Sequence, residues 1–315
     1  MRLSAKKRQK THNFYAFKTL FYGFKRAFEN VSLLGYQPGI FGIILDFWDY
    51  HGIFGFLLGF KIPKIHRFPL VKGIEKLDHY HGCLLIARHS THNGEILGTI
   101  VCIYHMTGRV LRSLMHRSLT PFFPVLRLMG AVPGEPKSAL SLLKSGFWVG
   151  VMPGGADEGM VGHENAYKVC WPKKRKGFAH IAIDADVPII PICISNVDEM
   201  RWNPILWIWN LLGLGRLFAY ILNLNIPYLS PVLLLLASTV WFLSTFIQIP
   251  IPAKITFHVG DPVQYDMSKD SIDDVVERAR IALQSLINRH QPHGKSYSNA
   301  VQERFQCLMK QWKKY

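Results

Sequence analysis

"CLLIARHSTHNGEIL", residues 83–97, joins a short apolar run to a cluster of polar side chains. Cys83–Ala87 has the length and composition of a buried strand, and the Asn-Gly pair at 93–94 is a turn signal. The seven positions from His89 to Glu95 hold two histidines and a carboxylate. Titratable groups at the end of a buried strand are typical of active sites in α/β proteins, so the stretch predicts such a site.

Strand and helix signals alternate along the rest of the chain. We expect strands over Cys83–Ala87, Phe147–Met152, Val187–Ile194 and Ala253–Val259. We expect helices near Glu95–Met106, Pro136–Lys144, Lys176–Asp184 and Ser271–Arg289. This alternation predicts an α/β fold with a mixed or parallel sheet flanked by helices.

The composition favours a protein that works at a membrane surface. The 315 residues are 49% hydrophobic yet carry a net charge of +16, and the mean hydropathy is +0.11. A membrane surface accommodates both properties. Nucleic acid is the rival partner for a basic protein, but the sequence has no recognition-helix or zinc-finger motif, so we expect none. The five cysteines lack a C-x-x-C spacing and are odd in number, which indicates reduced core residues in a cytosol-facing protein.

The N-terminal region, residues 1–64, is predicted to associate with the membrane. Residues 1–28 hold eight basic residues, no acid and many aromatics at helical spacing, which predicts an interfacial anchor helix and not a signal peptide. A disordered basic tail is the alternative for residues 1–12. Residues 35–60 are apolar but contain Asp46 and Asp49, which favours a shallow or re-entrant placement.

A second hydrophobic zone, at about 205–252, interrupts the expected α/β catalytic domain, residues 65–290. Its window "YLSPVLLLLASTVWFLSTFIQI", residues 228–249, is uncharged and long enough to cross a hydrocarbon core of about 30 Å. A single crossing would separate the two parts of one catalytic fold, so we expect a hairpin or a shallow element. Residues 291–315 are expected to form a basic C-terminal tail.

"VMPGGADEG", residues 151–159, is a second place where an expected strand ends in residues suited to a catalytic or binding site. Gly154 and Gly155 permit close approaches that a side chain would block, and can leave amide donors available to an anion. Glu158 follows, and the basic run 173–176 opens a helix, where donors also favour anions. The alternatives are a simple turn and a solvated charged face.

Four ordered motifs resemble one known family: "ARHSTHNGEI", "LMGAVPGEPKSALSLLKSGFWVGVMPGGADE", "KGFAHIAIDADVPIIPI" and "ITFHVGDPV". They look like the glycerolipid acyltransferases of the lysophospholipid acyltransferase superfamily. The Pro-Gly-Gly-x-x-Glu form resembles the diacylglycerol acyltransferase type 2 group and, more closely, the transmembrane protein 68 branch. The similarity covers residues 65–200 and 253–290.

The resemblance implies transfer of a fatty acyl group from acyl-CoA to a lipid hydroxyl at the endoplasmic reticulum membrane, with the site facing the cytosol or the membrane interface. No cofactor is implied, and acyl-CoA is the co-substrate. His89 would be the general base and Glu95 the acid of the catalytic dyad. The residues implied in substrate binding are His92, Lys137, Pro153, Gly154, Gly155, Glu158, Lys173, Lys174 and Arg175.

This chain departs from the family pattern in three ways. Five residues, instead of four, separate His89 from its acid, and that acid is Glu95 instead of an aspartate. Where many members carry an arginine for glycerol phosphate, this chain has only Lys137 nearby. The third departure favours a neutral acceptor: diacylglycerol, monoacylglycerol or a fatty alcohol.

The chemistry needs only a neutral imidazole, an orienting carboxylate and amide donors for the oxyanion. Three other functions stay open: a lysophospholipid or glycerol-phosphate acyltransferase, a catalytically drifted membrane scaffold, and a metal site, since His89, His92 and Glu95 lie at i, i+3 and i+6. A hydrolase is disfavoured because Gly-x-Ser-x-Gly is absent from the sequence.

Overall fold

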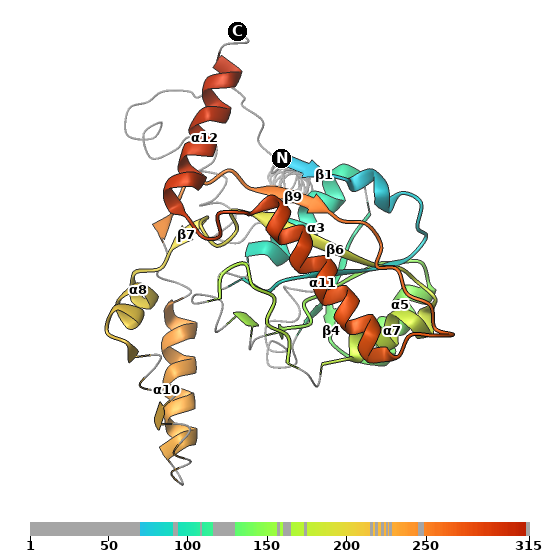
Figure 1. Ribbon diagram of the computed structural model, residues 1–315, viewed down its shortest axis with the longest axis horizontal. Helices are drawn as coiled ribbons and strands as arrows, with labels where there is room; N and C mark the ends of the chain where they lie inside the picture. Colours follow the sequence, from blue (N-terminus) through green and yellow to red (C-terminus); the bar gives the residue numbers. More distant parts are fainter. Residues whose placement is uncertain are drawn as a thin grey trace, which may run out of the picture.

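The structure, a computed structural model, describes residues 70–90, 94–107, 109–115, 130–155, 158–159, 165–172, 175–214, 217, 220–221, 224, 226, 229–244 and 249–312. The N-terminal region expected at a membrane, residues 1–64, lies outside them. Within the described ranges the elements are, in chain order (Figure 1), β1 (Leu70–Lys72), η1 (Ile74–Leu77), β2 (Cys83–Ala87), α3 (Gly94–Thr107), β3 (Arg112–Met115), β4 (Ala131–Pro133), α5 (Pro136–Lys144), β5 (Trp148–Val151), α7 (Gly177–Ala185), β6 (Ile189–Ser195), β7 (Arg201–Trp202), α8 (Pro204–Leu211), α10 (Leu229–Ser244), β8 (Ile249–Pro250), β9 (Thr256–Val259), α11 (Ile272–His290) and α12 (Tyr297–Trp312).

The central sheet has seven strands in the order β1-β9-β6-β2-β5-β3-β4. β2 pairs in parallel with β5 and β6, and β3 pairs in parallel with β4 and β5. β9 runs antiparallel to β6 and parallel to β1. The sheet is therefore mixed, which confirms the predicted α/β class. The carboxyl ends of β2 to β6 lie along one edge of it.

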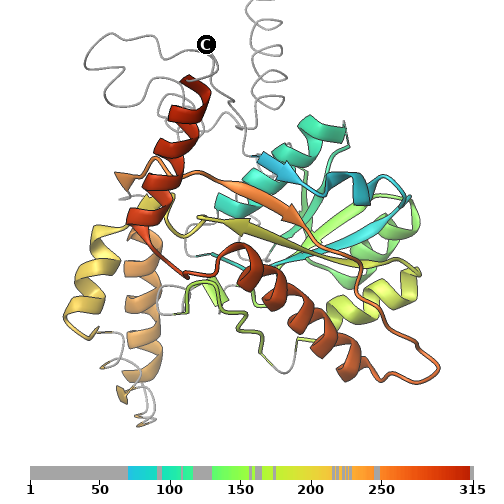
Figure 2. The same cartoon turned by 45° about the horizontal axis from the view of Figure 1, so that its top comes forward.

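Helices cover both faces of the sheet. On β2, Leu84 and Ile86 belong to a core cluster with residues of α5, α7 and α11, whereas Leu85 and Ala87 share a cluster with residues of α3. Figures 1 and 2 show α7 and α11 over one face and α3 over the other. All five residues of β2 are buried. Burial on both faces explains why the strand is a continuous apolar run and not an alternating one.

The predicted strands and helices are confirmed, with small differences at their ends. Pro136 occupies the first turn of α5, where its missing N–H costs nothing, and Ser271 caps α11 in a reciprocal capping box with Asp274. Strands β1, β3 and β4 were not predicted, because runs of three or four residues are too short to show a period. The expected C-terminal tail contains α12.

The hydrophobic zone at about 205–252 contains α8, α10 and β8, and α10 covers part of the uncharged window 228–249. α8 and α10 contact each other and lie apart from the body of the sheet in both views (Figures 1 and 2). In the part of the chain that the structure describes, no helix has both the length and the apolarity to cross a bilayer.

Candidate active site

Three segments leave the carboxyl edge of the sheet next to one another. β2 lies between β5 and β6 and runs parallel to both. The segments that follow these strands begin at residues 88, 152 and 196. Because parallel strands end at the same edge, the polar residues of these segments meet there. Hydrogen bonds and ion pairs link all three segments.

His89 follows β2, and hydrogen bonds fix both its backbone and its ring. Its backbone N–H donates to Oε2 of Glu158 at 2.8 Å. Its Nδ1 lies 2.9 Å from the carbonyl oxygen of Ser90. Because a carbonyl only accepts, Nδ1 carries the hydrogen and the lone pair of the neutral ring is on Nε2. In this tautomer Nε2 is the nitrogen that can act as a general base.

Among the side chains that the structure describes, Glu158, from the turn after β5, is the carboxylate that contacts His89. Its side chain is 1% exposed, and its Oε1 accepts a second hydrogen bond from the backbone N–H of Cys170 at 2.9 Å. Burial raises the pKa of Glu158 from 4.5 to about 7, although the two backbone N–H groups and the charge of Arg88 lower it. Glu158 therefore joins the turn after β5 to His89.

Glycines make this close packing possible. A Cβ at Gly154 would overlap the carboxylate of Glu158, and one at Gly159 would lie 3.1 Å from Nδ1 of His89. Gly155 has a φ of +57° and the guanidinium of Arg175 lies directly against it. The glycine turn predicted from "VMPGGADEG" thus lies beside the candidate base.

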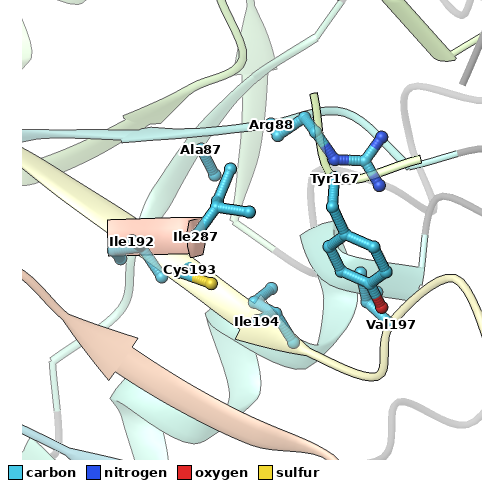
Figure 3. A pocket seen from close by; sticks show the side chains of 8 residues that line it. All are labelled: Ala87, Arg88, Tyr167, Ile192, Cys193, Ile194, Val197 and Ile287. Atoms are coloured by element: carbon cyan, nitrogen blue, oxygen red, sulfur yellow. The ribbon is translucent and has the colours of Figure 1, made fainter. Parts of the chain in front are cut away.

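Arg88 holds the other side of the His89 backbone. Its Nη1 donates to the carbonyl oxygen of His89 at 3.3 Å, and its Nη2 forms a buried ion pair with Asp198, which follows β6. The guanidinium also lies over the ring of Tyr167, 5.3 Å from its centroid. Figure 3 shows Arg88 and Tyr167 together at one side of a small cavity, with apolar side chains of β6 and α11 around the rest.

A second buried carboxylate extends this network. The Tyr167 hydroxyl donates to Glu199, whose other oxygen accepts the backbone N–H of Ser296 at 2.7 Å. The backbone N–H of Asp198 in turn donates to the Tyr167 hydroxyl at 3.2 Å. Burial raises the pKa of Glu199, while its hydrogen bond from Tyr167 lowers it. The network joins the end of β6 to the chain that precedes α12.

The predicted site residues have different outcomes. His89, Pro153, Gly154, Gly155, Glu158 and Arg175 come together at the carboxyl edge. Lys137 is exposed in the first turn of α5, which follows the edge strand β4, three strand positions from β2. Glu95 lies in the first turn of α3, but its side chain lies outside what the structure describes, as do His92, Lys173 and Lys174.

Among the described residues, no group of three His, Cys, Asp or Glu side chains could hold a metal ion. Sequence reasoning missed Arg88, Tyr167, Asp198 and Glu199. The one available signal was "SNVDEM", residues 195–200, which places two acids directly after a buried strand. His89 follows the buried strand β2 in the same way.

Comparison with known proteins identifies the family. A family model described as Acyltransferase matches residues 69–195, which run from β1 to β6. A Gallus gallus protein named "DGAT1/2-independent enzyme synthesizing storage lipids" is 30% identical over 278 residues, 85% of this chain and 70% of that protein. A Bos taurus protein of the same name is 28% identical over 244 residues, 76% of this chain and 65% of that protein.

The chain thus spans about two thirds of the length of these relatives, with 65% of the Bos taurus and of the Homo sapiens protein covered. Among solved structures, it is similar to the 1-acyl-sn-glycerophosphate (LPA) acyltransferase PlsC from Thermotoga maritima, with a TM-score of 0.42, 14% identity, and coverage of 85% of this chain and 98% of that one. The chain belongs to the glycerolipid acyltransferase family, in the branch that contains the DGAT1/2-independent relatives.

Proposed function

We propose that this protein is a membrane-bound O-acyltransferase that moves a fatty acyl group from acyl-CoA to the hydroxyl of a neutral glycerolipid. Diacylglycerol or monoacylglycerol is the acceptor, and the products are of the triacylglycerol type. The observation that carries the proposal is His89: Glu158 holds its backbone, and the carbonyl oxygen of Ser90 holds its ring in the tautomer whose lone pair is on Nε2. The name of the relatives, enzymes that synthesise storage lipids, supports it.

In the proposed reaction, Nε2 of His89 takes the proton of the lipid hydroxyl as its oxygen attacks the thioester carbonyl of acyl-CoA. The tetrahedral intermediate then collapses, the carbon–sulfur bond breaks, and the imidazolium returns the proton to the CoA thiolate. The products are an ester and free CoA. The backbone N–H of Gly155 already donates to the carbonyl oxygen of Met152 at 2.9 Å, so in this turn the N–H of Gly154 is the candidate donor to the oxyanion.

The two carboxylates have separate roles in this proposal. Glu158 holds the backbone of His89 through its N–H and so positions the ring. Glu95, in the first turn of α3, stabilises the imidazolium that forms when His89 takes the proton. Glu158 is therefore a positioning residue, and Glu95 completes the dyad.

The guanidinium of Arg175 lies against Gly155, in the turn beside His89. Arg175 and the rest of the basic run 173–176 therefore bind the negatively charged phosphates of the CoA moiety in this proposal. Lys137, the one predicted basic group on the acceptor side, lies in the first turn of the helix that follows β4, three strand positions from β2, the strand that His89 follows. That separation supports a neutral acceptor over a glycerol phosphate. We place the reaction at the endoplasmic reticulum membrane, with the site at the cytosolic face or the membrane interface.

The proposal is tested with His89→Ala. Loss of a general base lowers turnover by a factor of about 10² to 10⁴, so the variant should lose acyl transfer from labelled acyl-CoA to diacylglycerol in purified membranes. His180→Ala, which removes an exposed histidine of α7, should keep it. Lipid profiling of cells that overexpress each protein identifies the product. Near-normal turnover by His89→Ala together with an inactive His92→Ala would move the base to His92.

The same assay tests the acid and the acceptor. Glu95→Gln keeps the shape of the side chain and removes its charge, so it should lower kcat strongly with little change in KM. Glu95→Asp should keep partial activity. Wild-type turnover by Glu95→Gln would leave Glu95 as a charge that stabilises the first turn of α3. Faster transfer to a lysophospholipid or to glycerol phosphate than to diacylglycerol would favour the alternative acceptor class.

A further inference from the structure

The helix pair α8–α10 turns an apolar surface outward. Leu211 at the end of α8 is 67% exposed, and Leu235 on α10 is 70% exposed. α8 buries none of its eight residues. Other exposed apolar side chains of this region are Trp207, Ile208, Leu212, Leu217, Tyr220, Leu224, Ile226, Leu229, Val232, Leu236 and Ile249. An exposed apolar surface of this extent indicates that another molecule covers it and shields it from water.

The distribution of charge favours lipid as the partner. Residues 203–253 contain one charged residue, Arg216, whereas the whole chain carries a net charge of +16. A protein–protein interface has a polar, partly charged rim around its apolar centre. A stretch of 51 residues with a single charge matches the hydrocarbon region of a membrane, and the basic remainder of the chain suits anionic headgroups.

The start of α8 and the end of α10 are joined to each other, and we call this end of the helix pair its base. Asn203 caps α8 by accepting the backbone N–H of Leu206 at 3.0 Å, and its Nδ2 donates to the carbonyl oxygen of Ser244, the last residue of α10, at 3.1 Å. β7 and β8, which flank the pair, form an antiparallel ribbon. The rings of Trp202 and Trp207 lie 6.1 Å apart at this base, and tryptophan is enriched where a membrane protein meets the headgroups.

The base of the helix pair is tied to the candidate active site. Asp198, which forms the buried ion pair with Arg88, lies six residues before Pro204, the start of α8. Six residues of chain span at most about 21 Å. His89 follows Arg88 directly. The apolar helices therefore begin close to the sheet edge that carries His89.

We propose that α8 and α10 insert together into one leaflet of a lipid layer and bring the carboxyl edge of the sheet to its surface. α10 has 16 residues, so it is about 24 Å long, shorter than a hydrocarbon core of about 30 Å. An acceptor lipid in that leaflet then presents its hydroxyl at the layer surface, near His89. The role of this lipid as an acyl acceptor rests on the proposed function, but the insertion of the helices does not.

Photolabelling of the full chain tests the insertion. The protein is bound to phosphatidylcholine vesicles whose lipids carry a diazirine in the middle of the acyl chain, and labelled peptides are mapped by mass spectrometry. We expect label on peptides from 204–244 and none on the peptide of α11 that contains Ile281, which is 53% exposed but far from the helix pair in sequence. Label confined to residues outside 204–244 would overturn the proposal.

A double variant sharpens the test. Leu211→Glu with Leu235→Glu places two charges on the exposed face and should reduce label on 204–244 at least tenfold, while Ile281→Glu should leave it unchanged. Cross-links between α10 helices of two copies in place of lipid label would mean that a second copy covers this face. The labelling does not depend on turnover, so an inactive protein that is labelled refutes the proposed function alone. An active protein that is not labelled refutes the insertion alone.

Discussion

The carboxyl edge of the sheet and the helix pair α8–α10 distribute apolar and charged residues in opposite ways. At the sheet edge, apolar β2 is buried and charged Arg88, Asp198 and Glu158 are buried with it. In the helix pair, apolar side chains are exposed and charge is almost absent from the sequence. Charge buried at the sheet edge is paired and serves the candidate site. The apolar surface exposed on the helices suits the proposed contact with lipid.

This comparison predicts that substitutions in the two regions have very different effects on stability. Buried polar groups depend on their partners, because a partner's loss leaves an uncompensated group in a poorly solvated place. Truncating an exposed apolar side chain removes few buried contacts, so it should change the free energy of unfolding little.

Asp198→Ala should have the largest effect on stability. It leaves the guanidinium of Arg88 buried without its carboxylate, and breaking a buried pair in this way costs about 3–5 kcal/mol of the free energy of unfolding. The measurement is urea denaturation in mild detergent. The control, Asp261→Ala, breaks the exposed Lys76–Asp261 bridge of 2.7 Å and should cost less than about 1 kcal/mol.

Equal effects of the two aspartate substitutions would show that the Arg88–Asp198 pair is solvated, and would remove the distinction between buried and exposed charge. A stable Asp198→Ala protein with lowered kcat and unchanged KM would instead assign the pair to the positioning of His89, through the bond from Arg88 to its carbonyl oxygen.

Glu158 should make stability depend on pH. Its pKa is raised by burial to about 7, above the unfolded value of 4.5, so the folded state holds the proton more tightly. The resulting stabilisation is fully present below pH 4.5 and is lost as the pH rises through 7. A shift of this size corresponds to roughly 3 kcal/mol.

The measurement is the free energy of unfolding at pH 5 and pH 8 for the wild type and for Glu158→Gln. The decrease between the two pH values should be larger in the wild type, because glutamine does not titrate. His258, whose pKa burial lowers to about 4, contributes the opposite slope in both proteins and cancels in the comparison. Identical decreases in both proteins would mean that the Glu158 carboxyl titrates as it would in water.

The two regions also differ in how far the sequence could predict them. β2, β5, β6 and the helices between them could be predicted because apolar runs, Pro136 and Ser271 are local signals. His89 and the turn at Gly154 could be predicted because both follow such a strand. The exposure of α8 and α10 could not, because an apolar helix has the same sequence signature in a protein core and in a lipid layer.

The ion pair of Arg88 with Asp198 could not be predicted either. Its partners lie 110 residues apart, and only the parallel pairing of β2 with β6 brings them together. The resemblance implied Glu95 as the acid of the dyad, and its side chain lies outside what the structure describes. The bond from the His89 backbone N–H to Glu158, 69 residues away, could not be predicted. Spacing along the chain records local geometry, and the contacts of this site depend on the order of strands in the sheet.

The smallest effect on stability is expected for Leu235→Ala. Leu235 is 70% exposed, so its truncation in detergent should change the free energy of unfolding by no more than about 0.5 kcal/mol. The same substitution at Leu84, which is 0% exposed on β2, should cost about 2–5 kcal/mol, because it removes buried apolar contacts and leaves a cavity. Urea denaturation of both variants beside the wild type gives the two differences. A loss at Leu235 as large as that at Leu84 would mean that the exposed face of α10 is covered within the folded chain, and the contrast between the two regions would then fail.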